Sequence, residues 1–246
     1  MKKGYIGLWI VFALFLLIKL GNMMTITVPS VVWSVGLAVF LLIKCGLPVG
    51  KHIWISLLFG ILVSAACLLH GQGAAGLILF GISTVICSLA VFSVIKRSDN
   101  IKLLHGTDKR SVLLTVGLGA AVGIVLSLAN VLVFSAGQPA NLQLSPIPVI
   151  WALQPGIAEE IVYRAVFAAF CIYLSDKEQT KPERFTMYFM MIVPHALSHN
   201  YPIPECLILA LVFGLPLALL QRKRDIISAI TCHTVIDAVR FVIFGA

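Results

Sequence analysis

Nine long apolar segments constrain the fold of this chain more than any other feature of its sequence. A helix needs about 20 predominantly apolar residues to cross a bilayer, where it satisfies its backbone hydrogen bonds internally. The apolar segments cover residues 5–20, 27–43, 53–70, 74–95, 111–135, 149–174, 185–199, 205–220 and 225–244. Because the segment 185–199 is short, the sequence predicts an all-α, polytopic transmembrane helix bundle of about eight or nine spans.

The composition excludes a soluble globular domain. Of the 246 residues, 60% are hydrophobic and 11% are charged, and the mean hydropathy is +1.03. These values are typical of a polytopic membrane protein. The formal net charge of +8 could suit nucleic acid, but the basic residues lie in short loops between apolar segments. We therefore expect a single membrane-embedded domain over residues 1–246, with the lipid bilayer around it and no nucleic-acid partner.

The basic residues predict the orientation of the chain. Cytoplasmic loops of membrane proteins carry an excess of Lys and Arg. Alternate connections contain none, around residues 71–73, 136–148 and 200–204. The other connections and the N-terminus hold Lys2, Lys3, Lys44, Lys51, Lys96, Arg97, Lys102, Lys109, Arg110, Lys177, Lys181, Arg184, Arg222, Lys223 and Arg224. This asymmetry predicts a multi-pass protein with a cytoplasmic N-terminus, and we expect it in the plasma membrane of a prokaryote.

Two adjacent carboxylates and an arginine interrupt the sixth apolar segment. An ionisable residue at the centre of a membrane helix costs about 2.5–3.5 kcal/mol on insertion scales, and it marks a functional site by default. Pro155 is predicted to open a helix here. Glu160 and Arg164 are i and i+4, so they can form an ion pair on one face. Glu159 points about 100° away and has no local partner, which leaves it available as a general base. The alternative interpretation is a purely structural ion pair between helices.

Two further polar pairs lie in later apolar segments. His195 and His199 are i and i+4, but Ala196 stands where the zinc-protease pattern HExxH requires glutamate. A histidine near a helix end can also simply meet interfacial water, and this is the favoured interpretation of His195. His233 and Asp237 are likewise i and i+4, which lets the carboxylate orient the imidazole. Structural bonding between helices is the alternative for this pair.

The three polar clusters are predicted to meet near the middle of the membrane. With a helical rise of about 1.5 Å per residue, His233 lies roughly 12 Å and His199 roughly 21 Å from the inner side. Glu159 lies roughly 15 Å below the start of its own segment on the outer side. A carboxylate and histidines together can activate water, and a second polar group can stabilise an oxyanion. Glu159, His199 and His233 could instead ligate zinc, although no cofactor is our first expectation.

These motifs together resemble those of the CPBP family, the CAAX-protease and bacteriocin-processing (Abi) intramembrane proteases. Glu159, Glu160 and Arg164 look like its EExxxR motif, and His233 and Asp237 look like its HxxxN or HxxxD motif. His199 corresponds to the histidine of its FxxxH motif, but His195 replaces the phenylalanine. The motifs follow the family order, and residues 149–244 would form the catalytic core.

The resemblance implies an intramembrane endopeptidase that cleaves a membrane-associated or lipidated peptide or protein. Glu159 would activate water with the help of His199, without a metal. His233 and Asp237 would bind the oxyanion, and Glu160 and Arg164 would hold the shape of the site. Two other functions stay open: a non-catalytic scaffold or bacteriocin-immunity factor of the same fold, and a proton-coupled transporter. The sequence does not name the substrate.

Overall fold

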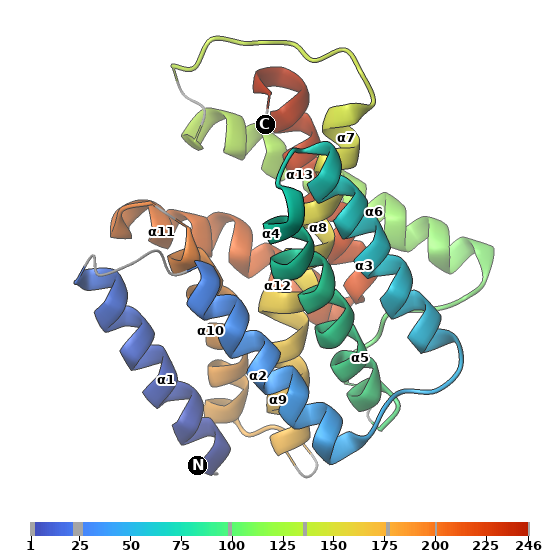
Figure 1. Ribbon diagram of the computed structural model, residues 1–246, viewed down its shortest axis with the longest axis vertical. Helices are drawn as coiled ribbons and strands as arrows, with labels where there is room; N and C mark the ends of the chain where they lie inside the picture. The colour runs from blue at the N-terminus through green and yellow to red at the C-terminus, as the bar shows by residue number, and fades with distance from the viewer. Residues whose placement is uncertain are drawn as a thin grey trace.

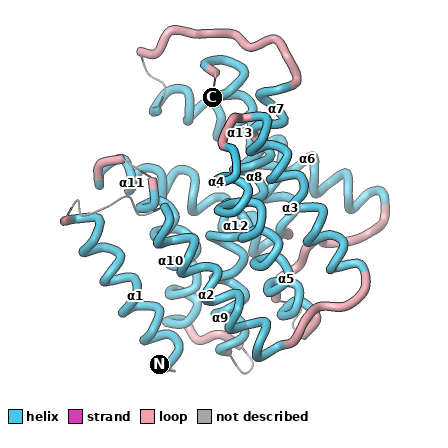
Figure 2. The backbone as a smooth tube through the Cα atoms, in the orientation of Figure 1, coloured by secondary structure: helices cyan, strands magenta, loops and turns pink. Residues whose placement is uncertain are grey.

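The structure is a computed structural model, and it describes residues 3–21, 27–97, 100–134, 137–175, 178–199 and 201–245. All regular secondary structure in these ranges is helical (Figures 1 and 2). The predicted all-α fold is therefore confirmed. Of the basic residues used to predict the orientation, Lys2 and Lys177 lie outside the described ranges.

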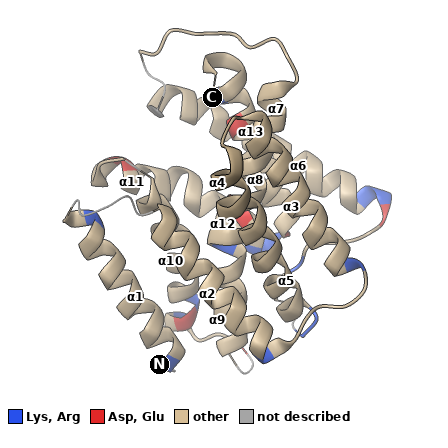
Figure 3. Cartoon of the chain, viewed as in Figure 1, with Lys and Arg blue, Asp and Glu red and all other residues tan. Residues whose placement is uncertain are grey.

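The first five apolar segments form the helices that precede the polar motifs. They are α1 (Lys3–Leu20), α2 (Thr27–Cys45), α3 (Lys51–Leu69), the continuous series α4 (Gly73–Gly76), η1 (Leu77–Ile82) and α5 (Ser83–Ile95), and α6 (Lys109–Phe134), where η denotes a π-helix. Many large apolar side chains on α1, α2, α3 and α6 are exposed, as expected of helices that face lipid. Lys and Arg lie mostly at the ends of helices (Figure 3).

The remaining four segments carry the motifs. They are α7 (Ile147–Trp151) with α8 (Leu153–Ala158), η2 (Glu159–Ala165) and α9 (Val166–Leu174); α10 (Lys181–Ser198); α11 (Ile203–Leu209) with η3 (Ala210–Gly214) and α12 (Leu215–Lys223); and α13 (Ile226–Phe244). Seven described helical segments are long and apolar enough to cross a membrane. The other two, residues 147–174 and α10, each contain three charged residues. They are also the two that carry most of the polar motif residues.

Two helix starts differ from the sequence predictions for identifiable reasons. The seventh segment begins at Lys181, because Thr180 and Glu183 form a capping box that lengthens α10 toward its N-terminus. Pro155 does not open its helix; it lies in the first turn of α8, which begins at Leu153 and follows α7 closely. Glu159 therefore sits well inside a helical segment, and the positive end of a helix dipole does not explain its position.

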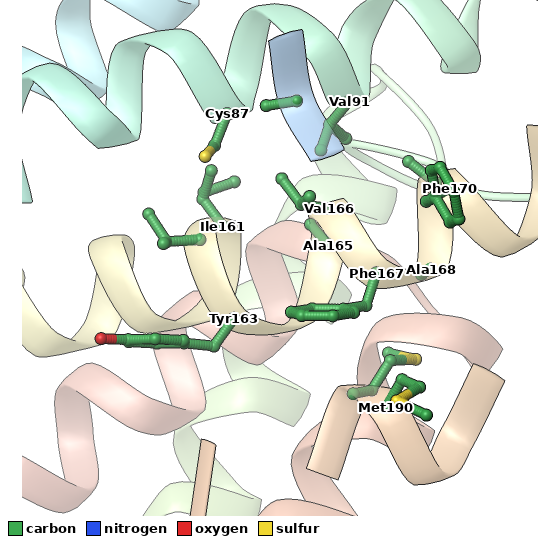
Figure 4. Packing of buried hydrophobic residues seen from close by; sticks show 14 of the residues in the cluster. Cys87, Val91, Ile161, Tyr163, Ala165, Val166, Phe167, Ala168, Phe170 and Met190 are labelled. Atoms are coloured by element: carbon green, nitrogen blue, oxygen red, sulfur yellow. The ribbon is translucent and has the colours of Figure 1, made fainter. Parts of the chain in front are cut away.

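The segment formed by η2 and α9 lies at the centre of the bundle. Every residue from 160 to 172 is buried, and the segment contacts α2, α5 and α10. Figure 4 shows Ile161 and Val166 directed toward Cys87 and Val91 of α5, while Phe167 lies on the side of Met190 from α10. A helix that is apolar around its whole circumference must be covered on all sides. The charged residues of η2 are thereby placed in the interior.

The last helix, α13, is fixed at its first turn by Asp225. This fully buried carboxylate caps α13 through the amide of Ser228 at 2.7 Å. It also accepts hydrogen bonds from the amide of His105 at 2.9 Å and from the hydroxyl of Thr115 at 2.8 Å. The start of α13 is thereby tied to the loop between α5 and α6, which contains His105, and to α6 itself, which contains Thr115. His233 and Asp237 follow two and three turns later on this anchored helix.

Two glycines allow α6 to approach α13 closely. A Cβ at Gly119 would lie 2.6 Å from the carbonyl oxygen of Ser228, and one at Gly123 would lie 2.7 Å from that of Cys232. The GxxxG spacing is the signature of close helix packing in membranes. The predicted packing role of these glycines is confirmed, and the packing holds the helix of the third motif in place.

We expect Gly123→Ala to destabilise the protein by about 1–3 kcal/mol, because the added methyl group would collide with a backbone oxygen that has little freedom to move. The check is thermal unfolding of the purified protein in detergent. Gly117→Ala is the matched control, since nothing lies within 4 Å of a Cβ at that position on the same helix. Equal melting temperatures for the two variants would contradict the packing role.

Candidate active site

The polar residues of the three motifs meet in the structure. Glu159, Glu160 and Arg164 lie on η2, His195 lies in the last turn of α10, and His233 and Asp237 lie on α13. His199 directly follows α10 with an extended backbone, so it is not inside the helix as the sequence suggested. The predicted meeting of the three clusters is confirmed by the contacts described below.

Glu160 is the buried anchor of the site. Its side chain is fully buried, and its Oε1 forms an ion pair with Nη1 of Arg164, as the i, i+4 spacing predicted. The same oxygen accepts a hydrogen bond from Nδ1 of His233 at 2.6 Å. A buried carboxylate is tolerated only where it is paired and hydrogen-bonded. The pairing of Glu160 therefore fixes η2 against α13.

Glu159 has a different environment from its neighbour. Its side chain is 17% exposed, and its Oε2 lies 2.8 Å from Nε2 of His195 and 3.5 Å from Nε2 of His233. The partners of Glu159 are thus imidazoles from two other helices. Of the two adjacent carboxylates, Glu160 is enclosed by an arginine and a histidine, and Glu159 is the one that solvent can reach.

Arg164 determines the tautomer of His195. Its Nη2 lies 3.0 Å from Nδ1 of His195, and a guanidinium can only donate hydrogen bonds. Nδ1 must therefore accept, which places the ring proton of a neutral His195 on Nε2, the nitrogen that lies 2.8 Å from Oε2 of Glu159. The ring is also stacked on Tyr163, with centroids 4.7 Å apart. His195 is buried rather than exposed to interfacial water, so that interpretation of the sequence was wrong.

His199 completes the group on the side of α10. One ring nitrogen of His199, one ring nitrogen of His195 and one carboxylate oxygen of Glu159 all lie within 4.8 Å of one another. His199 is therefore close to the carboxylate of Glu159. Its ring stacks on Tyr201 with centroids 5.8 Å apart, and its carbonyl oxygen accepts a hydrogen bond from Nζ of Lys19 at 2.7 Å. These contacts fix a residue that no longer has helical hydrogen bonds to orient it.

His233 and Asp237 are in contact along one face of α13, as predicted. Nε2 of His233 lies 3.4 Å from Oδ2 of Asp237. Because Nδ1 is bonded to Glu160, both ring nitrogens of His233 face carboxylate oxygens. This arrangement leaves the imidazole a single orientation, with Nε2 directed to the side of Glu159 and Asp237.

These residues line a cavity of about 270 Å³. Its polar wall contains Glu159, Arg164, His195, His199, His233 and Asp237. Its apolar wall includes Leu209, Phe213, Leu217, Ile236 and Phe241. Convergent polar groups beside an apolar wall are typical of an active or binding site.

The donor set does not fit a zinc site. The sequence alternative was Glu159, His199 and His233, but the described residues with metal-like spacing are Glu159, His195 and His199. A histidine that binds metal through Nε2 carries its proton on Nδ1 and normally donates it to an acceptor. Here Nδ1 of His195 faces a guanidinium nitrogen, which offers no acceptor. The tautomer that zinc requires would place two donors against each other.

The sequence did not reveal two features of the site. The first is the contact between His195 and Glu159, since we expected His199 rather than His195 to be functional. The i, i+4 spacing of the two histidines was the available signal that both could face the same carboxylate. The sequence also gave no sign that Glu160 and His233 bond to each other, because a contact between distant helices leaves no local pattern. Three further polar residues, Asn130, Gln154 and Arg240, line the cavity and were not predicted as part of it.

Comparison with known families is consistent with this geometry. Residues 141–239 match the family model described as Rce1-like, type II CAAX prenyl endopeptidase. The match contains all three motifs, in agreement with the resemblance predicted from the sequence, and it supports the predicted peptidase class. No curated protein and no solved structure matches the chain. Helices α1 to α6 precede the matched region.

We expect Arg164→Met to destabilise the protein by about 3–5 kcal/mol, because it leaves the buried charge of Glu160 without its cation. The double variant Glu160→Gln/Arg164→Met should lose less than the sum of the two single variants, since it removes both charges together. Unfolding in detergent measures all three, with the exposed Arg110→Gln as a control that should leave stability unchanged. Strictly additive losses would argue against the pairing.

Proposed function

We propose that this chain hydrolyses a peptide bond of a membrane-associated or lipidated peptide or protein, with water activated by Glu159. The observation that supports this most directly is the contrast between two adjacent carboxylates. Glu160 is fully buried and engaged by Arg164 and His233, whereas Glu159 lines the cavity among imidazoles. A carboxylate positioned in a cavity with nearby imidazoles can accept a proton from water.

In the proposed reaction, Glu159 is the general base. Nε2 of His195 lies 2.8 Å from Oε2 of Glu159, and this close contact would hold the carboxylate in place while it takes a proton from water. The resulting hydroxide attacks the carbonyl carbon of the peptide. Glu159 then gives the proton to the departing amine, so the same carboxylate acts first as base and then as acid. His199 stands beside Glu159 and would help to position the water.

His233 would stabilise the negative charge that develops on the carbonyl oxygen. Its Nδ1 is held by Glu160, and Asp237 lies 3.4 Å from its Nε2. A preorganised donor aimed at a developing oxyanion is usually a large contribution to catalysis. Because Nδ1–H is already donated to Glu160, donation from Nε2 as well requires the charged imidazolium form of His233. With aspartate rather than asparagine at position 237, we assign the donation to this imidazolium and its orientation to Asp237. Glu160 and Arg164 are positioning residues in this scheme.

The proposed substrate class follows from the cavity and from the family. The apolar wall of the cavity suits a peptide with apolar side chains, and the matching family is described as prenyl endopeptidases. The basic loops further support an orientation with the N-terminus in the cytoplasm, and we place the protein in a prokaryotic plasma membrane. No metal takes part in the proposed reaction.

We expect Glu159→Gln to lower kcat/KM by about 10²–10⁴-fold, which is the usual contribution of a general base, with little change in melting temperature. His199→Ala should also lower the rate. The assay is cleavage of a fluorogenic membrane-peptide library by the purified protein in detergent. Asp108→Asn, at an exposed position outside the cavity, is the control in which an amide likewise replaces a carboxylate. Full activity of Glu159→Gln would exclude the proposed base.

A strong chelator is expected to leave the cleavage rate unchanged. His195→Phe, which restores the residue usual in the family motif, should retain measurable activity because His195 orients Glu159 and does not hold a metal. Both effects are measured with the same peptides. Loss of activity on chelation with recovery on adding zinc would contradict the proposed mechanism while leaving the protease activity intact.

A further inference from the structure

A second cavity, of about 280 Å³, lies away from the active site. It is formed where the first turns of α10 approach the last turn of α12. Its lining includes Glu178, Gln179, Arg184, Tyr188, Arg222 and Lys223. Arg184 and His195 are eleven residues apart on the same helix, which corresponds to roughly 16 Å along the axis. The two cavities therefore lie toward opposite ends of α10.

The charges of the described residues that line this second cavity are unbalanced. They are three cations, Arg184, Arg222 and Lys223, and one carboxylate, that of Glu178. Within the part of the chain that the structure describes, none of these cations forms an ion pair with a carboxylate. Like charges that share a small space repel one another, so an anion in the cavity would be stabilised.

Arg222 has unused hydrogen-bonding capacity. The side chain is half-buried, and its Nε and Nη1 are shielded from solvent without a hydrogen-bond partner. Buried donors of a charged group normally have partners, and leaving them unpaired costs free energy. These free donors lie on different edges of the guanidinium, so each can donate separately to an oxygen of an anion such as phosphate. Arg184 and Lys223, both exposed, would add charge at the rim.

Apolar surface adjoins this charged cavity. Phe185, next to Arg184 on α10, is 63% exposed, and Leu219, one turn before Lys223 on α12, is 40% exposed. A ligand that combines an anionic group with hydrocarbon would contact both kinds of surface. Phospholipids have this combination, and basic pockets between membrane helices are known to bind their headgroups.

We propose that the cavity between α10 and α12 binds a phosphate group through Arg222, Arg184 and Lys223, supplied by the headgroup of an anionic phospholipid. The bound lipid would fix the N-terminal end of α10 against the C-terminal end of α12. Since α10 carries His195 near its other end, lipid binding would stabilise a helix that contributes to the active site.

The test is native mass spectrometry of the purified full chain in detergent, titrated with phosphatidylglycerol, phosphatidylcholine or inorganic phosphate. We expect phosphatidylglycerol to bind at least tenfold more tightly than phosphatidylcholine. The double variant Arg184→Gln/Arg222→Gln should lose this preference. Lys109→Gln/Arg110→Gln removes the same charge from exposed positions outside the cavity, so it should keep the preference.

Melting temperatures give a second measurement that does not depend on lipid counting. Without lipid, Arg184→Gln/Arg222→Gln should melt at the same temperature as the unsubstituted protein or higher, because it removes an unpaired, half-buried cation. Phosphatidylglycerol should raise the melting temperature of the unsubstituted protein and of the control variant only. A lower melting temperature of Arg184→Gln/Arg222→Gln without lipid would show that these arginines stabilise the fold by themselves. Because the proposal requires them to be unpaired in the absence of lipid, that result would overturn it.

The remaining outcomes separate the sources of phosphate. If inorganic phosphate alone binds and stabilises the protein through the same arginines, the site takes free phosphate and the phosphate chemistry stands. Equal binding of both lipids, or equal loss of binding in the cavity variant and the control, would show only general attraction to charged surfaces and would overturn the proposal.

Discussion

The carboxylate of Glu160 is the interaction on which the rest of the site depends. One of its oxygens is shared by Arg164 on its own helix and His233 on α13, and Arg164 continues to His195 on α10. Three helices are thus joined through one buried charge. Because such a charge is strongly destabilising without its partners, the folded state must bring these helices together in this register. The chain stabilises the carboxylate and positions the site with the same contacts.

This arrangement gives two adjacent glutamates different tasks. Glu160 is enclosed and cannot reach solvent, whereas Glu159 lines the cavity with Nε2 of His195 at 2.8 Å from its Oε2. The difference begins in η2, where the helix widens to π-helical geometry at Glu159. Widened turns of this kind occur frequently at functional sites, since they alter the direction in which successive side chains point. Here the widened turn separates a fully buried carboxylate from one that lines the cavity.

The helices around η2 act as a support for these few polar groups. Asp225 fixes the start of α13, and the glycines of α6 let that helix lie close along it. Gly156 lets α8 lie close to α13 in the same way, because a Cβ added at Gly156 would lie 3.0 Å from Cα of Thr234. Close packing on two sides restricts the position of His233 between them. A preorganised donor of this kind needs such rigid surroundings to be effective.

The sequence by itself determined the helical fold, the nine segments and the local pairs. Hydropathy fixes where a chain can cross a membrane, and the spacing i, i+4 fixes which side chains share a helix face, so Glu160–Arg164 and His233–Asp237 could be foreseen. Only the tertiary structure decided that His233 bonds to Glu160, that His195 is the nearest imidazole to Glu159, and that Pro155 lies inside a helical segment. These features arise from contacts between residues far apart in the chain. No local pattern encodes them, because each depends on how whole helices pack.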